Sequence, residues 1–182
     1  MGACPDKIRI AALAPSGQPL ASLASDGTHL YVLSHPDSRF YHRRAGELLT
    51  DFLSIPMKTA DMISLFCGRV PVFPHRSSKL VPNPEGNGWL LELRSAWGES
   101  VEKIYLDQTK ETVLKIESLD AQGLSLFQAE WGRVEEINGF FCPFWILLSD
   151  REGPVFELTV ERLWANPPVN PESFVLKPEK MG

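Results

Sequence analysis

Residues 88–166 decide the fold, and they read GWLLELRSAWGESVEKIYLDQTKETVLKIESLDAQGLSLFQAEWGRVEEINGFFCPFWILLSDREGPVFELTVERLWAN. Apolar runs alternate there with hairpin signals, which are Trp97-Gly98-Glu99, Asp107-Gln108-Thr109-Lys110, Asp120-Ala121-Gln122-Gly123, Asn138-Gly139 and Asp150-Arg151-Glu152-Gly153. Turns spaced by about 8–12 residues are typical of an antiparallel meander and not of alternating strands and helices. The stretch predicts strands over residues 89–96, 100–106, 112–119, 124–131, 132–137, 144–149 and 154–163.

The N-terminal part of the chain predicts more strands of the same kind. They are expected over residues 7–14, 18–24, 28–34 and 39–42. The turn at Ser25-Asp26-Gly27 supports a hairpin, because Asp-Gly supplies the positive-φ residues that a tight turn needs. The fold class is therefore mainly β, with antiparallel pairing.

A helical segment separates the two groups of strands. Residues 46–54 carry Leu48, Leu49, Phe52 and Leu53 at helical spacing, and Ile55-Pro56 ends that helix because a residue before proline avoids the α region. A second helix is expected over residues 59–67, with Thr59 or Asp61 as its cap. Residues 69–87 contain four prolines and predict a long surface loop.

Composition sets limits on the class of protein. A length of 182 residues suits a single domain over residues 1–182. The net charge is −5 and no basic stripe is present, which argues against nucleic acid as a partner. No apolar run approaches the length of about 18 residues that a membrane-spanning helix needs. The three cysteines fit either buried thiols or one disulfide with one thiol left over.

No catalytic or metal-binding motif stands out. His29, His35, His42 and His75 have no metal-ligand spacing, so neither a metal nor another cofactor is expected. Cys67 follows Phe66 on an apolar helix face, where a structural thiol is more common than a nucleophile. No G-x-S-x-G serine motif is present. The sequence therefore predicts a protein that is not an enzyme.

An apolar surplus marks the candidate binding site. Methionine together with aromatic and aliphatic residues fits an adaptable hydrophobic cavity, although the same residues also fit an ordinary core. The residues expected to line a ligand-binding cavity are Leu13, Leu23, Leu33, Phe52, Met57, Met62, Phe66, Trp89 and Leu91.

Three segments carry a family resemblance. They are DKIRIAALAPSGQPLASLASDGTHLYVLS near the start, Leu65-Phe66-Cys67-Gly68-Arg69-Val70-Pro71, and Phe174-Val175-Leu176-Lys177-Pro178 as a closing strand. Together with the meander they resemble the LolA/LolB family of bacterial lipoprotein carriers. The resemblance implies an incomplete β-barrel, which is a strongly curved antiparallel sheet with short helices over residues 46–67 lidding its open side.

The resemblance also implies a function and a location. It implies a monomer that binds lipid or lipoprotein acyl chains at the periplasmic face of the bacterial outer membrane, with a possible envelope protein partner. The family's first strands, an export signal and a lipid-anchored cysteine would then precede this sequence, although a short native start fits equally well. A surface-binding or assembly module with a collapsed cavity is the alternative. A lipid hydrolase is a third and weaker one, because no triad is present.

Overall fold

A computed structural model describes residues 2–3, 7–44, 55–164 and 168–177. Contacts within the chain define two compact units. The N-terminal unit comprises residues 1–49, 57–64 and 166–182, and the second unit comprises residues 50–56 and 65–165. None of the helices in the described part of the chain has the length and apolarity that a membrane crossing requires.

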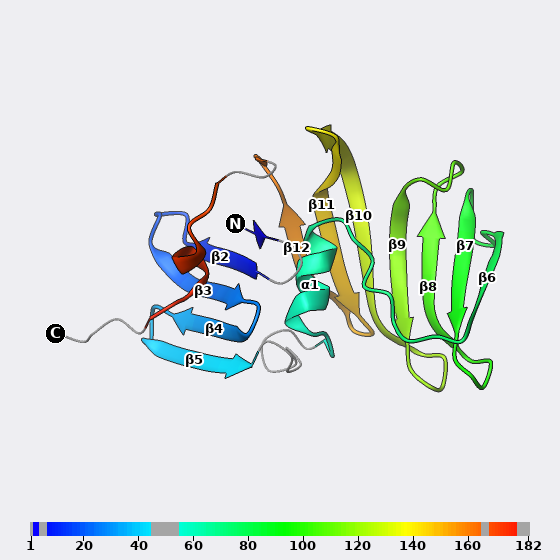
Figure 1. The fold of residues 1–182 in the computed structure, drawn as a ribbon, viewed down its shortest axis with the longest axis horizontal. Coiled ribbons are helices and arrows are strands. Elements are labelled where there is room, and N and C mark those ends of the chain that lie inside the picture. The colour runs from blue at the N-terminus through cyan, green and yellow to red at the C-terminus, as the bar shows by residue number, and fades with distance from the viewer. Residues whose placement is uncertain (1, 4–6, 45–54, 165–167, 178–182) are drawn as a thin grey trace. The chain divides into compact units, whose positions relative to one another are not determined.

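The N-terminal unit contains an antiparallel sheet in the order β1-β2-β3-β4-β5 (Figure 1). Its strands are β1 Gly2–Ala3, β2 Lys7–Leu13, β3 Pro19–Asp26, β4 His29–Ser34 and β5 Arg39–Arg44. The four strands expected from the sequence are confirmed. Each follows its neighbour through a short turn, so the pairing is the one that local sequence favours.

Asp26 organises the turn between β3 and β4. Its Oδ1 accepts hydrogen bonds from the amides of Thr28 (2.8 Å) and His29 (2.7 Å), and its Oδ2 accepts one from the Tyr31 hydroxyl (2.9 Å). Burial acts to raise the pKa of Asp26, but the hydrogen bonds from His29, Thr28 and Tyr31 together lower it below its ordinary value of 3.8. The ionised carboxylate is therefore part of the folded turn.

We expect Asp26→Asn to destabilise the N-terminal unit near neutral pH. A carboxyl whose pKa is lowered by folding stabilises the fold above the pKa of the unfolded chain, and this contribution is lost as pH falls through the folded pKa. Thermal unfolding of both proteins between about pH 6 and pH 2 should show the difference shrinking below about pH 4. A difference that stays constant over this range would contradict the assignment.

The two faces of the N-terminal sheet carry different side chains. Cross-strand register pairs Ser22 with Leu33, and Leu23 with Val32, so Leu33 and Leu23 lie on opposite faces. Buried Leu33 belongs to a small cluster with Ala24, Tyr31 and Leu176.

The C-terminal segment packs on the face that carries Leu33. The resemblance implied a closing strand at Phe174-Val175-Leu176-Lys177-Pro178, and no strand forms over its described residues, 174–177. The segment instead forms a 3-10 helix, η2 Pro171–Phe174, followed by residues that belong to no strand. Arg9 Nη1 donates to the Ser173 carbonyl oxygen (3.0 Å), and Leu176 is buried in the cluster, so the segment is held by side-chain contacts.

The second unit contains an antiparallel sheet in the order β12-β11-β10-β9-β8-β7-β6 (Figure 1). Its strands are β6 Ser77–Pro82, β7 Trp89–Arg94, β8 Ser100–Leu106, β9 Val113–Leu119, β10 Ser125–Ile137, β11 Phe140–Asp150 and β12 Gly153–Thr159. The antiparallel meander predicted for residues 88–166 is confirmed, with each strand paired to its neighbour in the chain.

Two strands differ from the sequence-based prediction. Residues 69–87 are not a continuous loop, since β6 lies within them and pairs Leu80 with Leu91 of β7. Pro82 is tolerated because β6 is the edge strand, where a missing N–H costs no ladder hydrogen bond. The expected break at Gly132 is absent, because β10 continues along β11 through the pair Gly132 and Trp145. A Cβ at Gly132 would lie 3.0 Å from the Trp145 ring, so glycine leaves room for that ring.

The helix prediction and the single-sheet prediction have different outcomes. The helix expected over residues 59–67 is confirmed as α1 Thr59–Phe66, whereas the helix expected over residues 46–54 lies outside the described residues.

The resemblance implied one curved sheet, but the described strands form two sheets. Residues 45–76 separate β5 from β6, which is too long a connection for a hairpin, so the second meander starts anew.

Candidate functional site

One face of the seven-stranded sheet carries a continuous apolar row. Paired residues of neighbouring antiparallel strands share a face, and the register joins one residue from each of the seven strands. The row, from β6 to β12, is Leu80, Leu91, Ile104, Ile116, Ala129, Leu148 and Phe156. We call this face the apolar face.

Exposure changes along the row. Ile104, Ile116, Ala129 and Leu148 are buried, and Ile116 is fully covered at 0% exposure. Leu91 is half-buried, and Leu80 on the edge strand is 43% exposed. The apolar face therefore runs from a dry centre on β8–β11 to an open end on β6 and β7.

The opposite face of the same sheet carries a polar row. Its corresponding row is Lys79, Glu92, Lys103, Glu117 and Gln128. Lys103 Nζ lies 3.5 Å from Glu117 Oε2, and Gln128 Nε2 donates to Glu117 Oε1 at 3.2 Å. This row presents charge and hydrogen-bonding groups, whereas the next row on the same face pairs buried Leu90 with buried Tyr105.

Two segments contact the buried part of the apolar face. At the C-terminal end of α1, the indole Nε1 of Trp131 donates to the Leu65 carbonyl oxygen (2.9 Å), and the Phe66 ring lies 5.7 Å from that of Phe156. Further along the chain, the amide of Phe73 donates to Glu102 Oε2 (3.2 Å) on β8. These contacts give a hydrogen bond to a helix-terminal carbonyl and to one oxygen of the buried Glu102 carboxylate, and they leave Leu80 and Leu91 at the open end.

The phenylalanine at position 73 also anchors its segment by packing. Its ring meets the Phe127 ring edge-on, with centroids 6.2 Å apart. Edge-on aromatic pairs add a favourable interaction beyond the burial of area. The segment before β6 is therefore fixed over the centre of the apolar face.

Eight of the nine residues expected to line a cavity are described, and they are divided between the two units. Trp89 and Leu91 lie on the apolar face, Phe66 contacts Phe156, and Met57 and Met62 are buried. Leu13 is 59% exposed, and Leu23 and Leu33 lie on opposite faces of the N-terminal sheet. Phe52 lies outside the described residues.

Sequence reasoning missed Leu80. Its strand was hidden in a stretch with four prolines, although Lys79-Leu80-Val81 contains two strand-forming residues. The pairing of Leu80 with Leu91 places it at the open end of the apolar face.

The cysteines and histidines that the structure describes form no metal site. Cys67 is disulfide-bonded and Cys142 is a free thiol, which is the second of the two alternatives that the cysteine count left open. Burial raises the pKa of the Cys142 thiol. Within the described residues, no three His, Cys, Asp or Glu side chains are grouped so that they could hold a metal ion. The rings of His29 and His42 instead lie tilted against each other, with centroids 4.7 Å apart.

Two solved structures are similar to this chain over most of its length. A LolA superfamily protein from Nitrosomonas europaea has a TM-score of 0.45 at 14% identity, covering 87% of this chain and 74% of that one. A domain from Vibrio parahaemolyticus, described as an outer membrane lipoprotein-sorting protein, has a TM-score of 0.49 at 9% identity, covering 91% and 77%. The description of the first names the family that the sequence resembles. No protein-family model and no curated protein matches the chain.

Proposed function

We propose that this protein binds acyl chains of lipids or lipoproteins without catalysing a reaction, for carriage to or insertion in the bacterial outer membrane. The observation that carries the proposal is the open end of the apolar face, where Leu80 and Leu91 continue the row of buried core residues towards solvent. A contiguous apolar surface that leaves the core and stays partly exposed is typical of a binding site. In this proposal the seven-stranded sheet is the wall of a hydrophobic cavity within a strongly curved, incomplete barrel.

Burial of an acyl chain supplies enough free energy for such a site. Each methylene removed from water contributes about 0.8 kcal/mol. A chain of about ten buried methylenes would therefore gain roughly 8 kcal/mol, against an association cost of at least about 4 kcal/mol. The surplus corresponds to reversible binding, which is what a carrier needs, because its cargo must also leave.

In this proposal Leu65 and Phe66, at the C-terminal end of α1, act as a lid. An eight-residue helix is marginal by itself and depends on packing for its stability. At the C-terminal end of α1, the described contacts are the hydrogen bond from Trp131 to Leu65 and the ring contact of Phe66 with Phe156. A ligand that extends from Leu91 towards the centre of the apolar face would have to displace such contacts, so the lid would open on binding.

The disulfide at Cys67 supports an envelope location. Disulfides persist in oxidising compartments such as the bacterial periplasm and are rare in the cytosol. We therefore propose the periplasmic face of the outer membrane as the site of action, with lipid or lipoprotein cargo and an envelope protein as partners.

A surface-binding or assembly module is the second candidate. The observation that favours it is a set of highly exposed aromatic side chains on the second unit, namely Trp97, Phe141 and Trp164. Exposed aromatic residues are enriched where proteins meet partners. In this reading the apolar face would be filled by the protein itself, and no acyl ligand would enter.

The test compares two neighbouring substitutions on the edge strand β6. Leu80→Glu puts a charge on the apolar face, whereas Val81→Glu puts the same charge on the opposite face, next to Leu90. We expect Leu80→Glu to weaken binding of a dansyl-labelled undecanoic acid at least about tenfold, because burial of a leucine side chain is worth about 1.5–3 kcal/mol. Val81→Glu should change the affinity less than about threefold.

Circular dichroism of both variants checks that the fold is kept. Equal effects of the two substitutions would show that the apolar face is not the binding surface. Failure of the wild-type protein to bind the labelled acid, or any acyl chain of similar length, would favour the surface-binding module.

A further inference from the structure

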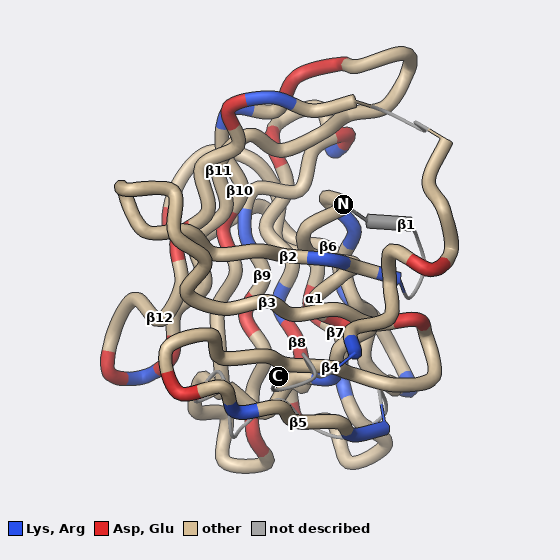
Figure 2. The backbone as a smooth tube through the Cα atoms, turned by 90° about the vertical axis from the view of Figure 1, so that its left-hand side faces the viewer, with Lys and Arg blue, Asp and Glu red and all other residues tan. Residues whose placement is uncertain are grey.

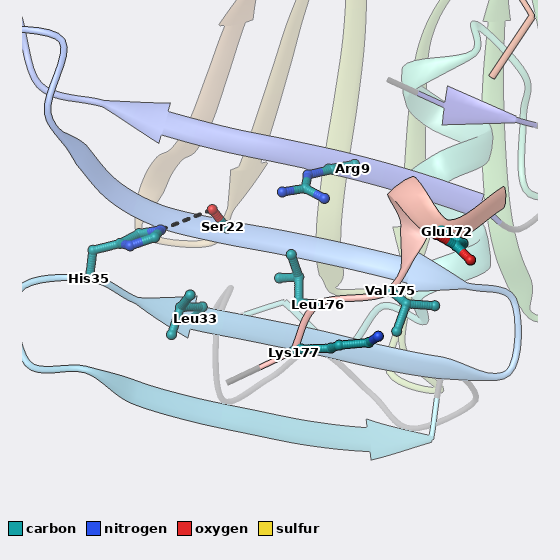
Figure 3. A pocket seen from close by; sticks show the side chains of 8 residues that line it. All are labelled: Arg9, Ser22, Leu33, His35, Glu172, Val175, Leu176 and Lys177. Carbon is teal, nitrogen blue, oxygen red and sulfur yellow. Dashed lines mark hydrogen bonds between the residues drawn. The ribbon is translucent and has the colours of Figure 1, made fainter. Parts of the chain in front are cut away.

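We infer a second binding site, on the N-terminal sheet, for an anionic group attached to a short aliphatic chain. The site is a pocket of about 570 Å³ between the sheet face that carries Leu33 and the C-terminal segment (Figure 3). Its lining residues are Arg9, Ser22, Leu33, His35, Glu172, Val175, Leu176 and Lys177. A volume of this size falls in the range of about 300–1,000 Å³ that is typical of small-molecule sites.

The base of the pocket is apolar. Leu33 on β4 and Leu176 of the C-terminal segment are both buried in the same cluster, and Val175 packs against that cluster. Figure 3 shows the Leu176 side chain between the strands and the C-terminal segment, facing the space below Arg9. The aliphatic part of a ligand would pack against the small apolar surface that these side chains present.

One end of the pocket gathers hydrogen-bond donors. Ser22 Oγ lies 3.1 Å from His35 Nε2, and the His35 amide donates to the Leu20 carbonyl oxygen (3.0 Å), which fixes the histidine against β3. With its proton on Nε2, the imidazole donates to Ser22, and the hydroxyl proton of Ser22 can then be donated to a ligand. Figure 3 shows His35 and Ser22 at the end opposite Glu172, with Arg9 reaching over from β2.

Charge around the pocket favours an anion. Arg9 is held in place by its hydrogen bond to the Ser173 carbonyl, so its positive charge is fixed at the pocket wall. Lys177 adds a second cation, and Glu172 is the one carboxylate among the lining residues.

The basic residues of the N-terminal unit are unevenly placed. Over its full ranges the unit contains eight Lys and Arg against seven Asp and Glu, so its total charge is close to balanced. Figure 2 shows the basic residues on β2 and β5, two strands whose sequences contain no acid. A cluster of like charge with a partly buried wall raises the local concentration of oppositely charged ligands.

The arrangement therefore fits an amphiphilic acid. Its anionic group would lie near Ser22, His35 and Arg9, and its aliphatic part would lie along Leu33 and Leu176. Either a carboxylate or a phosphate monoester has this chemistry, and both are accepted by hydroxyl, imidazole and guanidinium donors. The site is separate from the apolar face and does not depend on the function proposed for it.

The test is a titration of the full chain with four probes, followed by the backbone amide resonances of residues 20–35 and 172–177. The probes are octanoate, octyl phosphate, octanol and inorganic phosphate. We expect one or both of the octyl anions to shift these resonances saturably, with octanol and inorganic phosphate at least about tenfold weaker. Whichever octyl anion binds more tightly identifies the head group.

Matched variants locate the binding. Lys177→Gln and His35→Gln should each weaken binding of the octyl anion at least about threefold. Lys58→Gln, which removes one charge elsewhere in the same unit, should change it less than twofold. Leu80→Glu, which tests the apolar face of the other sheet, should also leave it unchanged.

Three results would overturn the inference. Octanol binding as tightly as the anions would remove the anionic requirement, and inorganic phosphate binding as tightly as octyl phosphate would remove the aliphatic one. Full affinity in both His35→Gln and Lys177→Gln would show that the anion does not bind in this pocket.

Discussion

Replacing Gly88 by alanine is expected to destabilise the second unit by about 4 kcal/mol or more, which is beyond the range of most single substitutions. Gly88 precedes β7 with φ +98°, a conformation that residues with a Cβ rarely adopt. A Cβ at this position would lie only 2.2 Å from the Leu106 carbonyl oxygen and 3.1 Å from the Asp107 carbonyl carbon. Both neighbours are backbone atoms, so relief would require the β7–β8 pairing to shift.

Gly98 provides the matched control for this substitution. It has a similar φ of +88°, but nothing lies within 4 Å of its would-be Cβ. Gly98→Ala should therefore cost only the conformational strain of about 1–2 kcal/mol. Urea denaturation followed by tryptophan fluorescence gives both values, and similar losses in the two variants would show that close approach at Gly88 does not matter.

Truncation of Phe127 to alanine should cost about 3–5 kcal/mol of unfolding free energy. The Phe127 side chain is 1% exposed on the apolar face, and its ring packs edge-on against Phe73. Its removal would leave a cavity under the segment before β6 and would release one anchor of that segment. Increased hydrogen exchange at Phe73 and at Leu80 should accompany the loss of stability.

Leu124 is the control for that truncation. It lies at the start of the same part of the chain, just before β10, and is 54% exposed. Leu124→Ala should cost less than about 1 kcal/mol, because most of its side chain is already in water. A small loss for Phe127→Ala, similar to that of Leu124→Ala, would mean that the centre of the apolar face is loosely packed and open to ligand.

The hairpin signals in the sequence were sufficient for most strands because they act locally. Asp120 accepts hydrogen bonds from the amides of Gln122 and Leu124 through Oδ1, and Asp107 accepts them from Glu111 and Thr112. Such turns involve residues two to five positions apart, so composition and spacing reveal them. The same holds for the ends of α1, where the amide of Lys58 donates to Asp61 Oδ2 (3.4 Å) and the amide of Gly68 donates to the Leu65 carbonyl oxygen (3.0 Å).

The candidate site was predicted less well, because a face is a property of register. Leu23 and Leu33 look equivalent in the sequence. A shift of one position in strand pairing moves a side chain to the other face of the sheet. The β3–β4 register puts Leu23 and Leu33 on opposite faces. The structure places Trp89 and Leu91 on the apolar face. Leu80 was not predicted to lie there, because its strand β6 was not predicted. Leu13 follows a register irregularity after Ala12 and is exposed.

The sequence by itself determined the antiparallel strands, their turns and the helix α1, because these depend on interactions between near neighbours in the chain. Only the tertiary structure decided the division into two sheets, the open end of the apolar face, and the pocket that joins Arg9 to the C-terminal segment. Arg9 and Ser173 are separated by 164 positions, and no local pattern encodes a contact over that distance. Such contacts form when distant side chains, such as Leu33 and Leu176, pack into one buried cluster. That packing depends on the whole unit.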